Sequence, residues 1–142
     1  MDDFAWDADE LGLQIARHTP EAIIIADRAG VIRYWNGGAR KLFGFTTQEA
    51  LGQTLDIIIP EKHRRAHWAG WESVVRTGKS RYQADELLAV PGLRKDGSRI
   101  SLEFSIFSIA DRYGDTIAIG ATLRDVSHHF NKIKELAARL NA

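Results

Sequence analysis

The stretch IIPEKHRRAHWAGWE, residues 58–72, holds two histidines four residues apart, His63 and His67, followed closely by Trp68 and Trp71. A neutral imidazole can serve as a metal ligand, as a general base, or as a hydrogen-bonded polar group on a helix. On a helical period of 3.6 residues, Trp71 and His63 each lie four residues from His67, and so about 40° to either side of it on the same face of the helix. If Trp71 faces a pocket, His67 points into the same pocket.

The remaining composition restricts the chemistry that these histidines can do. The chain has no cysteine, which excludes disulfides, thiolate nucleophiles, iron–sulfur clusters and Cys-ligated zinc. Zinc held by His63 and His67 is disfavoured, because Arg64 and Arg65 between them repel a divalent cation and no third ligand is evident. HRRAH also lacks the glutamate of a zinc-protease motif. With no acid, base and nucleophile constellation visible, we do not expect an enzyme.

Length and charge set the broad class. A chain of 142 residues that is 44% hydrophobic has the size of one compact domain. Nineteen Lys plus Arg balance nineteen Asp plus Glu, so no net field favours nucleic acid or an anionic membrane. No apolar run approaches the roughly 20 residues that span a bilayer, and the acidic start MDDFAWDADE is unlike a signal peptide. We therefore expect a soluble, cytoplasmic protein that binds neither nucleic acid nor membrane.

The elements that must position the histidines alternate along the chain. Periodic apolar residues and capping signals, among them the capping-box spacing of Thr46 and Glu49, predict helices over residues 8–19, 39–43, 47–51 and 60–77 and in the tail from 124. β-rich or alternating runs predict strands over 22–27, 31–35, 80–90, 100–106 and 117–123. Pro60 suits the start of the long helix and Gly78 its end, while Asn36 is expected to close a turn. Pro91 and Gly92 are expected to close the third strand.

The tail carries a seam of coiled-coil type. Its apolar residues recur at alternating four- and three-residue steps: Val126, Phe130, Ile133, Ala137 and Leu140. There are too few heptads for strong dimerisation by this helix alone. Both packing back onto its own domain and pairing with another helix stay open.

Four stretches, in this order, resemble signatures of the PAS family. They are IxxxDxxGxIxYWN at 23–36, AxxLFGFTTQEALG at 39–52, the RKDGS turn at 94–98 and RDVS at 124–127. The resemblance implies an α+β fold, in which a five-stranded antiparallel sheet carries short helices and one long helix on one face. It divides the chain into an N-terminal helical cap (1–19), the PAS domain (20–127) and a C-terminal signalling helix (128–142).

PAS domains are generally sensors whose pocket ligand or dimer contacts modulate a neighbouring effector. Blue-light PAS domains of the LOV and photoactive-yellow-protein types use a cysteine that is absent here. In haem-binding PAS oxygen sensors, the proximal iron ligand is a histidine of the long helix within P-E-x-x-R-x-x-H, and PEKHRRAH puts His67 at that position. The resemblance therefore implies haem b with His67 as the proximal metal ligand.

The expected cofactor pocket is otherwise apolar. Its walls would come from the residues Trp71, Leu87, Leu88, Phe104 and Ile106, with residues 57–59. The haem-binding relatives carry a distal Arg or Met where this chain has Glu86 and two leucines, and a Tyr where it has Gly70. These departures favour five-coordinate iron with a hydrophobic distal side.

Other interpretations stay open. Arginine- and histidine-rich starts of this helix occur in many PAS sequences without a demonstrated cofactor, so an unknown small organic ligand, noncovalent FAD stacked on tryptophan, or an empty pocket are alternatives. The preferred function is a homodimeric sensory domain that binds a small molecule or gas and relays its state through the C-terminal helix to a downstream effector. The alternative is a cofactor-free module for dimerisation or protein interaction.

Overall fold

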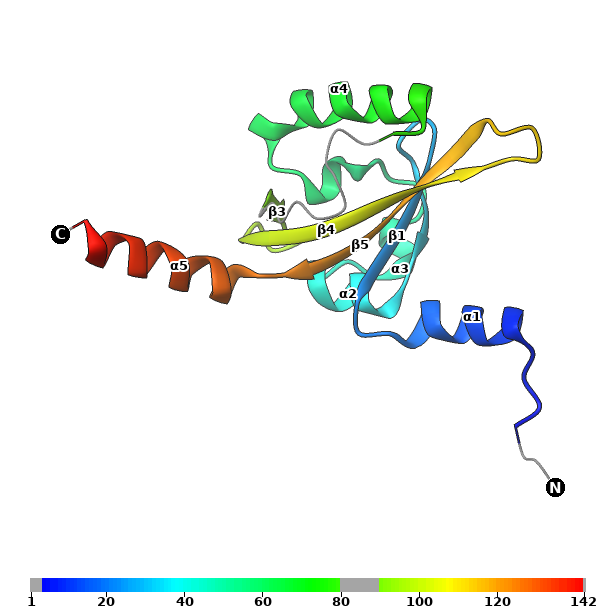
Figure 1. The fold of residues 1–142 in the computed structure, drawn as a ribbon, viewed down its shortest axis with the longest axis horizontal. Helices are drawn as coiled ribbons and strands as arrows, with labels where there is room; N and C mark the ends of the chain where they lie inside the picture. Colours follow the sequence, from blue (N-terminus) through cyan, green and yellow to red (C-terminus); the bar gives the residue numbers. More distant parts are fainter. Residues whose placement is uncertain (1–3, 80–89, 142) are drawn as a thin grey trace.

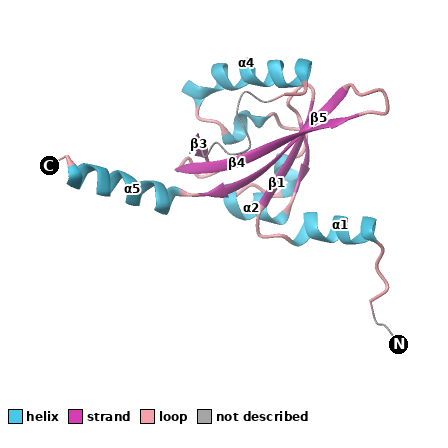
Figure 2. Ribbon diagram, in the orientation of Figure 1, coloured by secondary structure: helices cyan, strands magenta, loops and turns pink. Residues whose placement is uncertain are grey.

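A computed structural model describes residues 4–79 and 90–141 (Figure 1). In chain order the elements are α1 (Ala8–His18), β1 (Ala22–Asp27), β2 (Ile32–Trp35), α2 (Gly37–Phe43), α3 (Thr47–Ala50), the 3-10 helix η1 (Leu55–Ile58), α4 (Glu61–Thr77), β3 (Val90–Leu93), β4 (Arg99–Ala110), β5 (Thr116–Asp125) and α5 (Ser127–Leu140). The strands form one antiparallel sheet in the order β2-β1-β5-β4-β3. The predicted α+β fold with flanking helices is confirmed (Figure 2).

One face of the sheet builds the core. Along β1 every second residue is buried, and Ala22, Ile24 and Ala26 are at most 3% exposed. The antiparallel register places Leu123 and Ile119 of β5 opposite Ala22 and Ala26, so the buried positions of both strands share a face. The short helix α2 packs against β1, and its Phe43 side chain is fully buried.

The turn between β1 and β2 is organised by Asp27. Its carboxylate accepts hydrogen bonds from the backbone N–H groups of Ala29 at 3.0 Å and Val31 at 3.1 Å, and from Arg33 Nε at 2.8 Å. Partial burial raises the pKa of Asp27, but the hydrogen bonds from Arg33 and the two backbone groups outweigh it and hold that pKa below its usual value. The aspartate of the D-x-x-G pattern thus holds the turn of this hairpin in its conformation through these hydrogen bonds.

Asn36 joins three elements through one buried amide. Its Oδ1 accepts from the backbone N–H groups of Ile23 at 2.8 Å and Ala39 at 2.9 Å. Its Nδ2 donates to the carbonyl oxygens of Ala16 at 2.8 Å and Glu21 at 3.0 Å. The side chain therefore caps α2 while it ties the end of α1 to the start of β1, and the turn predicted at this residue is a helix N-cap.

Three details differ from the sequence-based predictions. The 3-10 helix η1 was not predicted. Pro91 and Gly92 lie inside β3 rather than closing a strand, and the predicted strand up to residue 89 falls outside the described residues. Of the two arrangements left open for the tail, the structure does not show packing back onto the domain, because α5 projects from the end of β5 and has no buried residue (Figure 1).

In the described part of the chain, no helix combines the length and the apolar character that crossing a membrane requires.

Replacing Asn36 by Asp keeps the oxygen that accepts two backbone hydrogen bonds but sets a carboxylate oxygen against the carbonyls of Ala16 and Glu21. We expect the free energy of unfolding to fall by about 2–4 kcal/mol, because two buried acceptors lose their donor and face a like charge. Urea unfolding at pH 7 measures the change. Asn131→Asp on the exposed surface of α5 is the matched control, and equal losses in both variants would contradict the role given to Asn36.

Candidate functional site

The candidate histidine lies on α4, whose ends are defined by local chemistry. Pro60 precedes the first helical residue, where a missing N–H costs nothing. Gly78 ends the helix in the left-handed conformation with φ 71°, and its N–H bonds the Val74 carbonyl at 2.7 Å. The helix was predicted over residues 60–77, and the observed start is one residue later because Pro60 is the N-cap. No residue of α4 is fully buried, so its position depends on a few specific contacts.

Two tryptophans anchor α4 to the N-terminal half of the fold. Trp68 Nε1 donates to Asp56 Oδ1 of η1 at 2.8 Å, and Trp71 Nε1 donates to the carbonyl oxygen of Arg28 at 3.0 Å. The Trp68 ring also lies against Gly30, where φ is 80° and an added Cβ would come within 2.2 Å of the ring. Glycine is required there by both the backbone conformation and the ring.

His67 immediately precedes Trp68 in the sequence and packs against the rings of both Trp68 and Trp71. Its ring centroid is 4.6 Å from Trp68 in an edge-on arrangement and 5.9 Å from Trp71 in a tilted one. The side chain is partly buried, and its Nδ1 atom is shielded from solvent without a hydrogen-bond partner in the described structure. A buried polar atom without a partner is uncommon in folded proteins and points to a missing ligand, ion or water.

Electrostatics favour the neutral form of this imidazole. Burial lowers the pKa of His67 below its usual value, and the carboxylate of Asp56 only partly opposes that effect. Asp56 is itself approached by a cation, since Arg64 Nε lies 3.9 Å from its Oδ1 and donates to the Ile59 carbonyl at 3.0 Å. His67 is therefore uncharged at neutral pH and has a nitrogen lone pair available.

The structure places the predicted pocket residues on two elements. His67 and Trp71 come together on α4, as the helical period predicts. Phe104 and Ile106 of β4 pair with Leu123 and Ala121 of β5, and both are partly buried. Phe104 packs against the buried core. The predicted wall residues Leu87 and Leu88 lie outside the described residues.

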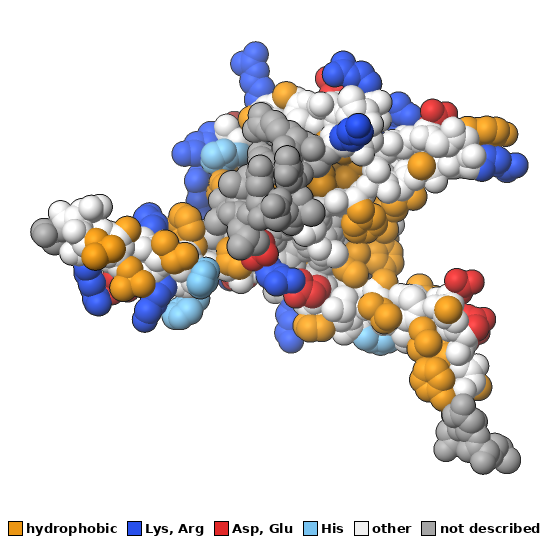
Figure 3. Space-filling model, viewed as in Figure 1, with side chains coloured by type: hydrophobic (Ala, Val, Ile, Leu, Met, Phe, Trp, Pro, Cys, Tyr) orange, Lys and Arg blue, Asp and Glu red, His pale blue; other side chains and the backbone are white. Residues whose placement is uncertain are grey.

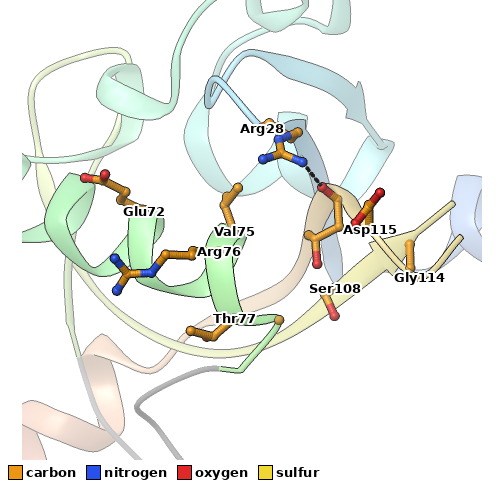
Figure 4. A pocket seen from close by; sticks show the side chains of 11 residues that line it. Arg28, Glu72, Val75, Arg76, Thr77, Ser108, Gly114 and Asp115 are labelled. Carbon is orange, nitrogen blue, oxygen red and sulfur yellow. Dashed lines mark hydrogen bonds between the residues drawn. The ribbon is translucent and has the colours of Figure 1, made fainter.

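A separate cleft of about 530 Å³ lies at the far end of α4, against the β4–β5 hairpin (Figure 4). Arg28 lies on one side of this cleft and donates from Nη1 to the Thr116 carbonyl at 3.1 Å. Val75 and Thr77 approach from α4, and Ser108 from the hairpin. Its described lining contains none of the predicted pocket residues that the structure describes, so we treat this cleft as distinct from the histidine site.

The described residues contain no metal site built from side chains alone. There, no group of three or more His, Asp or Glu residues is arranged to hold a metal ion. His63 and His67 thus have no third protein ligand near them in that part of the structure. A metal at His67 finds no further protein ligands among the described residues, whereas an iron porphyrin brings its own.

Sequence reasoning missed the partners that orient the histidine region. Asp56 receives the Trp68 N–H and lies close enough to affect the His67 pKa, and the Arg28 carbonyl holds Trp71. The only local signal for Asp56 is its place two residues after Thr54, whose Oγ1 accepts the Asp56 N–H at 3.3 Å. The contact with Trp68 is tertiary and leaves no local pattern.

Comparisons with known proteins agree on one family. The family model described as PAS fold matches residues 16–129. The sensor protein FixL of Bradyrhizobium diazoefficiens is 30% identical over 135 residues, which is 92% of this chain but 26% of FixL. An uncharacterised protein of Azorhizobium caulinodans is 30% identical over 117 residues, covering 82% of this chain and 16% of that protein. The chain thus spans about a quarter or less of these curated relatives.

Solved structures show the same fold. The PAS domain of a protein from Colwellia psychrerythraea superposes with a TM-score of 0.75 at 20% identity, covering 86% of this chain and 99% of that one. An RNA-binding light-oxygen-voltage receptor gives a TM-score of 0.74 at 19% identity, covering all of this chain and 40% of the receptor. At these identities the likeness concerns the fold alone.

The lowered pKa of His67 predicts a pH dependence of stability. As the pH falls below the usual histidine pKa of 6.5, His67 binds a proton in the unfolded chain more readily than in the folded one. The stability contributed by neutral, buried His67 is therefore present above pH 6.5 and is lost as the pH falls further. We expect the free energy of unfolding to drop more between pH 7 and pH 5 in the wild type than in His67→Gln. Urea titrations at a series of pH values measure both slopes, and identical slopes would contradict the burial of this imidazole.

Proposed function

The chain is a sensory domain of the PAS family, and we propose that it detects its signal through haem b bound beside α4, with His67 as the axial ligand of the iron. Haem is the preferred ligand. An unknown small organic molecule and FAD are the alternatives. With this assignment, the signal would be a small molecule or a gas, and the domain would pass it to a downstream effector.

The observation that carries the proposal is the unpartnered nitrogen of His67. Nδ1 is shielded from solvent and makes no hydrogen bond in the described structure. The imidazole is neutral because burial lowers its pKa. A neutral ring with an available lone pair is the form that binds iron, and iron would satisfy a nitrogen that the described protein groups leave without a partner. His67 also occupies the histidine position of the P-E-x-x-R-x-x-H pattern.

The types of side chain on α4 and β4 support an apolar macrocycle as the ligand. Trp71 lies beside the His67 ring, and Phe104 and Ile106 belong to the core-facing side of β4. These side chains would provide aromatic and aliphatic walls, which exclude water and hold the ring by packing. Bound haem would supply an iron centre that responds to a diatomic gas or to redox state. The remaining residues hold the imidazole in place and keep it uncharged.

A route for the response leads from the sheet to α5. Phe104 pairs with Leu123 on β5, and β5 ends two residues before α5 begins. The junction is fastened to β4, since the Val126 N–H donates to the Ser101 carbonyl at 2.8 Å and the Ser101 N–H donates to Ser127 Oγ at 2.9 Å. A shift of β4 against β5 would therefore move the first turn of the helix. This supports relay through the C-terminal segment 128–142.

A second candidate function is pairing of chains without any cofactor. It is favoured by the terminal helices, which expose large apolar side chains, among them Ile15 at 65% and Ile133 at 53%. Exposed apolar residues clustered on projecting helices are typical of interaction surfaces. The two functions are compatible, because the histidine site and these helices are separate parts of the molecule.

The haem proposal is tested by titrating haemin into the apo protein and recording visible absorption spectra. For the wild type we expect saturation at one haem per chain, a sharp Soret band, and shifts of this band on reduction and on exposure to carbon monoxide. His67→Ala should weaken haem binding by about 10- to 100-fold, or change the band shape, because the axial ligand is removed.

His63→Ala is the matched control, because it removes an imidazole one turn earlier on the same helix. It should leave the spectrum of the complex unchanged. Free-haemin spectra for all three proteins would overturn the haem assignment. Parallel titrations with FAD then decide whether flavin is the ligand, while a colourless protein that still self-associates would favour the pairing function.

A further inference from the structure

The cleft at the far end of α4 is lined by charged side chains of both signs. Arg28 and Arg76 are its basic residues, and Glu72 and Asp115 are its acidic ones. In the described part of the chain, none of these four side chains forms an ion pair. Figure 3 shows both basic and acidic atoms over α4 and the adjoining hairpin, at the top and upper right. Charged groups that converge on a cleft without pairing are available to a ligand.

Arg28 is fixed in place by two hydrogen bonds. Its carbonyl oxygen accepts from Trp71 Nε1 at 3.0 Å, and its Nη1 donates to the Thr116 carbonyl at 3.1 Å. The other N–H groups of the guanidinium make no hydrogen bond in the described structure and lie at the cleft (Figure 4). An arginine oriented in this way can bind a carboxylate through two N–H groups at once.

Asp115 is the acidic neighbour of this cation. It directly precedes Thr116, the residue whose carbonyl holds Arg28. Its backbone N–H donates to Asp111 Oδ1 at 3.0 Å, whereas its carboxylate has no hydrogen-bond partner among the described residues. In Figure 4 Glu72 and Arg76 lie across the cleft from it, on α4. One wall of the cleft thus offers a fixed cation beside an unpaired carboxylate.

The rest of the lining leaves room for a small molecule. Gly78 and Gly114 have no side chain, and Ser108 and Ala110 have short ones. The volume of about 530 Å³ falls within the range of roughly 300–1,000 Å³ that is usual for small-molecule sites. Val75 offers an apolar contact from α4, and Ser108 offers a hydroxyl. The cleft therefore fits a polar molecule that has a short apolar part.

A ligand with charge of one sign would meet like charges here. An anion would approach Glu72 and Asp115, and a cation would approach Arg28 and Arg76. A molecule with one carboxylate and one ammonium group complements both signs. We propose that this cleft is a second ligand site that binds a free α-amino acid, with its carboxylate on Arg28 and its ammonium group on Asp115. Both charged groups of an α-amino acid are attached to one carbon, which matches the neighbouring positions of these two residues.

This site is separate from the haem site proposed at His67. Its described lining includes no histidine, and its link to the histidine helix is the hydrogen bond from Trp71 to the Arg28 carbonyl. The inference therefore goes beyond the proposed function and does not rest on it. It gives the domain an input for a second class of small molecule.

Isothermal titration calorimetry of the full chain tests the proposal, with each of the twenty standard L-amino acids as the probe in turn. We expect at least one to bind at one molecule per chain with a dissociation constant of about 1 mM or lower. The N-acetyl derivative of that amino acid lacks the ammonium charge, and its amide lacks the carboxylate charge. Each derivative should bind about tenfold more weakly or worse, because a charge-assisted hydrogen bond is lost.

Two variants locate the site. Arg28→Gln and Asp115→Asn each remove one of the proposed charged contacts and should raise the dissociation constant about tenfold or more. Asp115→Asn is the sharper test, because its carboxylate holds no described group in place. Arg65→Gln and Glu61→Gln make the same charge changes at exposed positions of α4 outside the cleft and should leave binding unchanged. Thermal melting of each variant verifies that it folds.

Four results would overturn the proposal. They are no binding of any L-amino acid up to about 10 mM, a derivative that binds as tightly as its parent, binding that neither Arg28→Gln nor Asp115→Asn weakens, and loss of binding in His67→Ala. The last result would place the ligand at the histidine instead. We expect His67→Ala to bind the amino acid as tightly as the wild type whether or not haem binds at His67, which keeps failure of this proposal distinguishable from failure of the haem assignment.

Discussion

The fold depends most on the buried amide of Asn36. One side chain makes four hydrogen bonds to main-chain groups of α1, the loop before β1, β1 itself and α2. An amide is suited to this position because it offers two donors and an acceptor oxygen with two lone pairs, whereas a carboxylate or an aliphatic side chain would leave partners unsatisfied. With β1 and α2 fixed in this way, the core face of the sheet and the buried Phe43 have a defined place.

The histidine site is held by a different set of contacts. Helix α4 has no buried residue, and two indole N–H groups connect it to η1 and to the β1–β2 turn. The same tryptophans pack against His67, and its partial burial lowers the pKa of the imidazole and favours the neutral form. The residues that position the helix therefore also set the chemistry of its histidine. A ligand at His67 would bear directly on contacts that determine where α4 lies.

Much of this could be predicted from the sequence where local chemistry is decisive. The capping box of Thr46 and Glu49 and the left-handed glycine after α4 were predicted and are confirmed, because caps and turns are fixed by neighbouring residues. Helix η1 was missed because a four-residue helix has no apolar period. Pro91 was expected to end a strand, yet β3 lies at the sheet edge, where a residue without an N–H is tolerated. The tail was predicted as a helix, but its position relative to the domain is set by tertiary packing, which a local sequence pattern does not give.

The helical period correctly predicted that His67 and Trp71 lie together, whereas the Asp56 contact with Trp68 joins residues twelve apart and had no sequence signal.

Haem ligation by His67 is tested most directly by a resonance Raman spectrum of the reduced haem complex, recorded with and without ¹⁵N-labelled histidine. We expect an iron–nitrogen band that shifts with the label in the wild type and is absent from His67→Ala. A spectrum without such a band, or with the band unchanged in His67→Ala, would contradict haem ligation by His67.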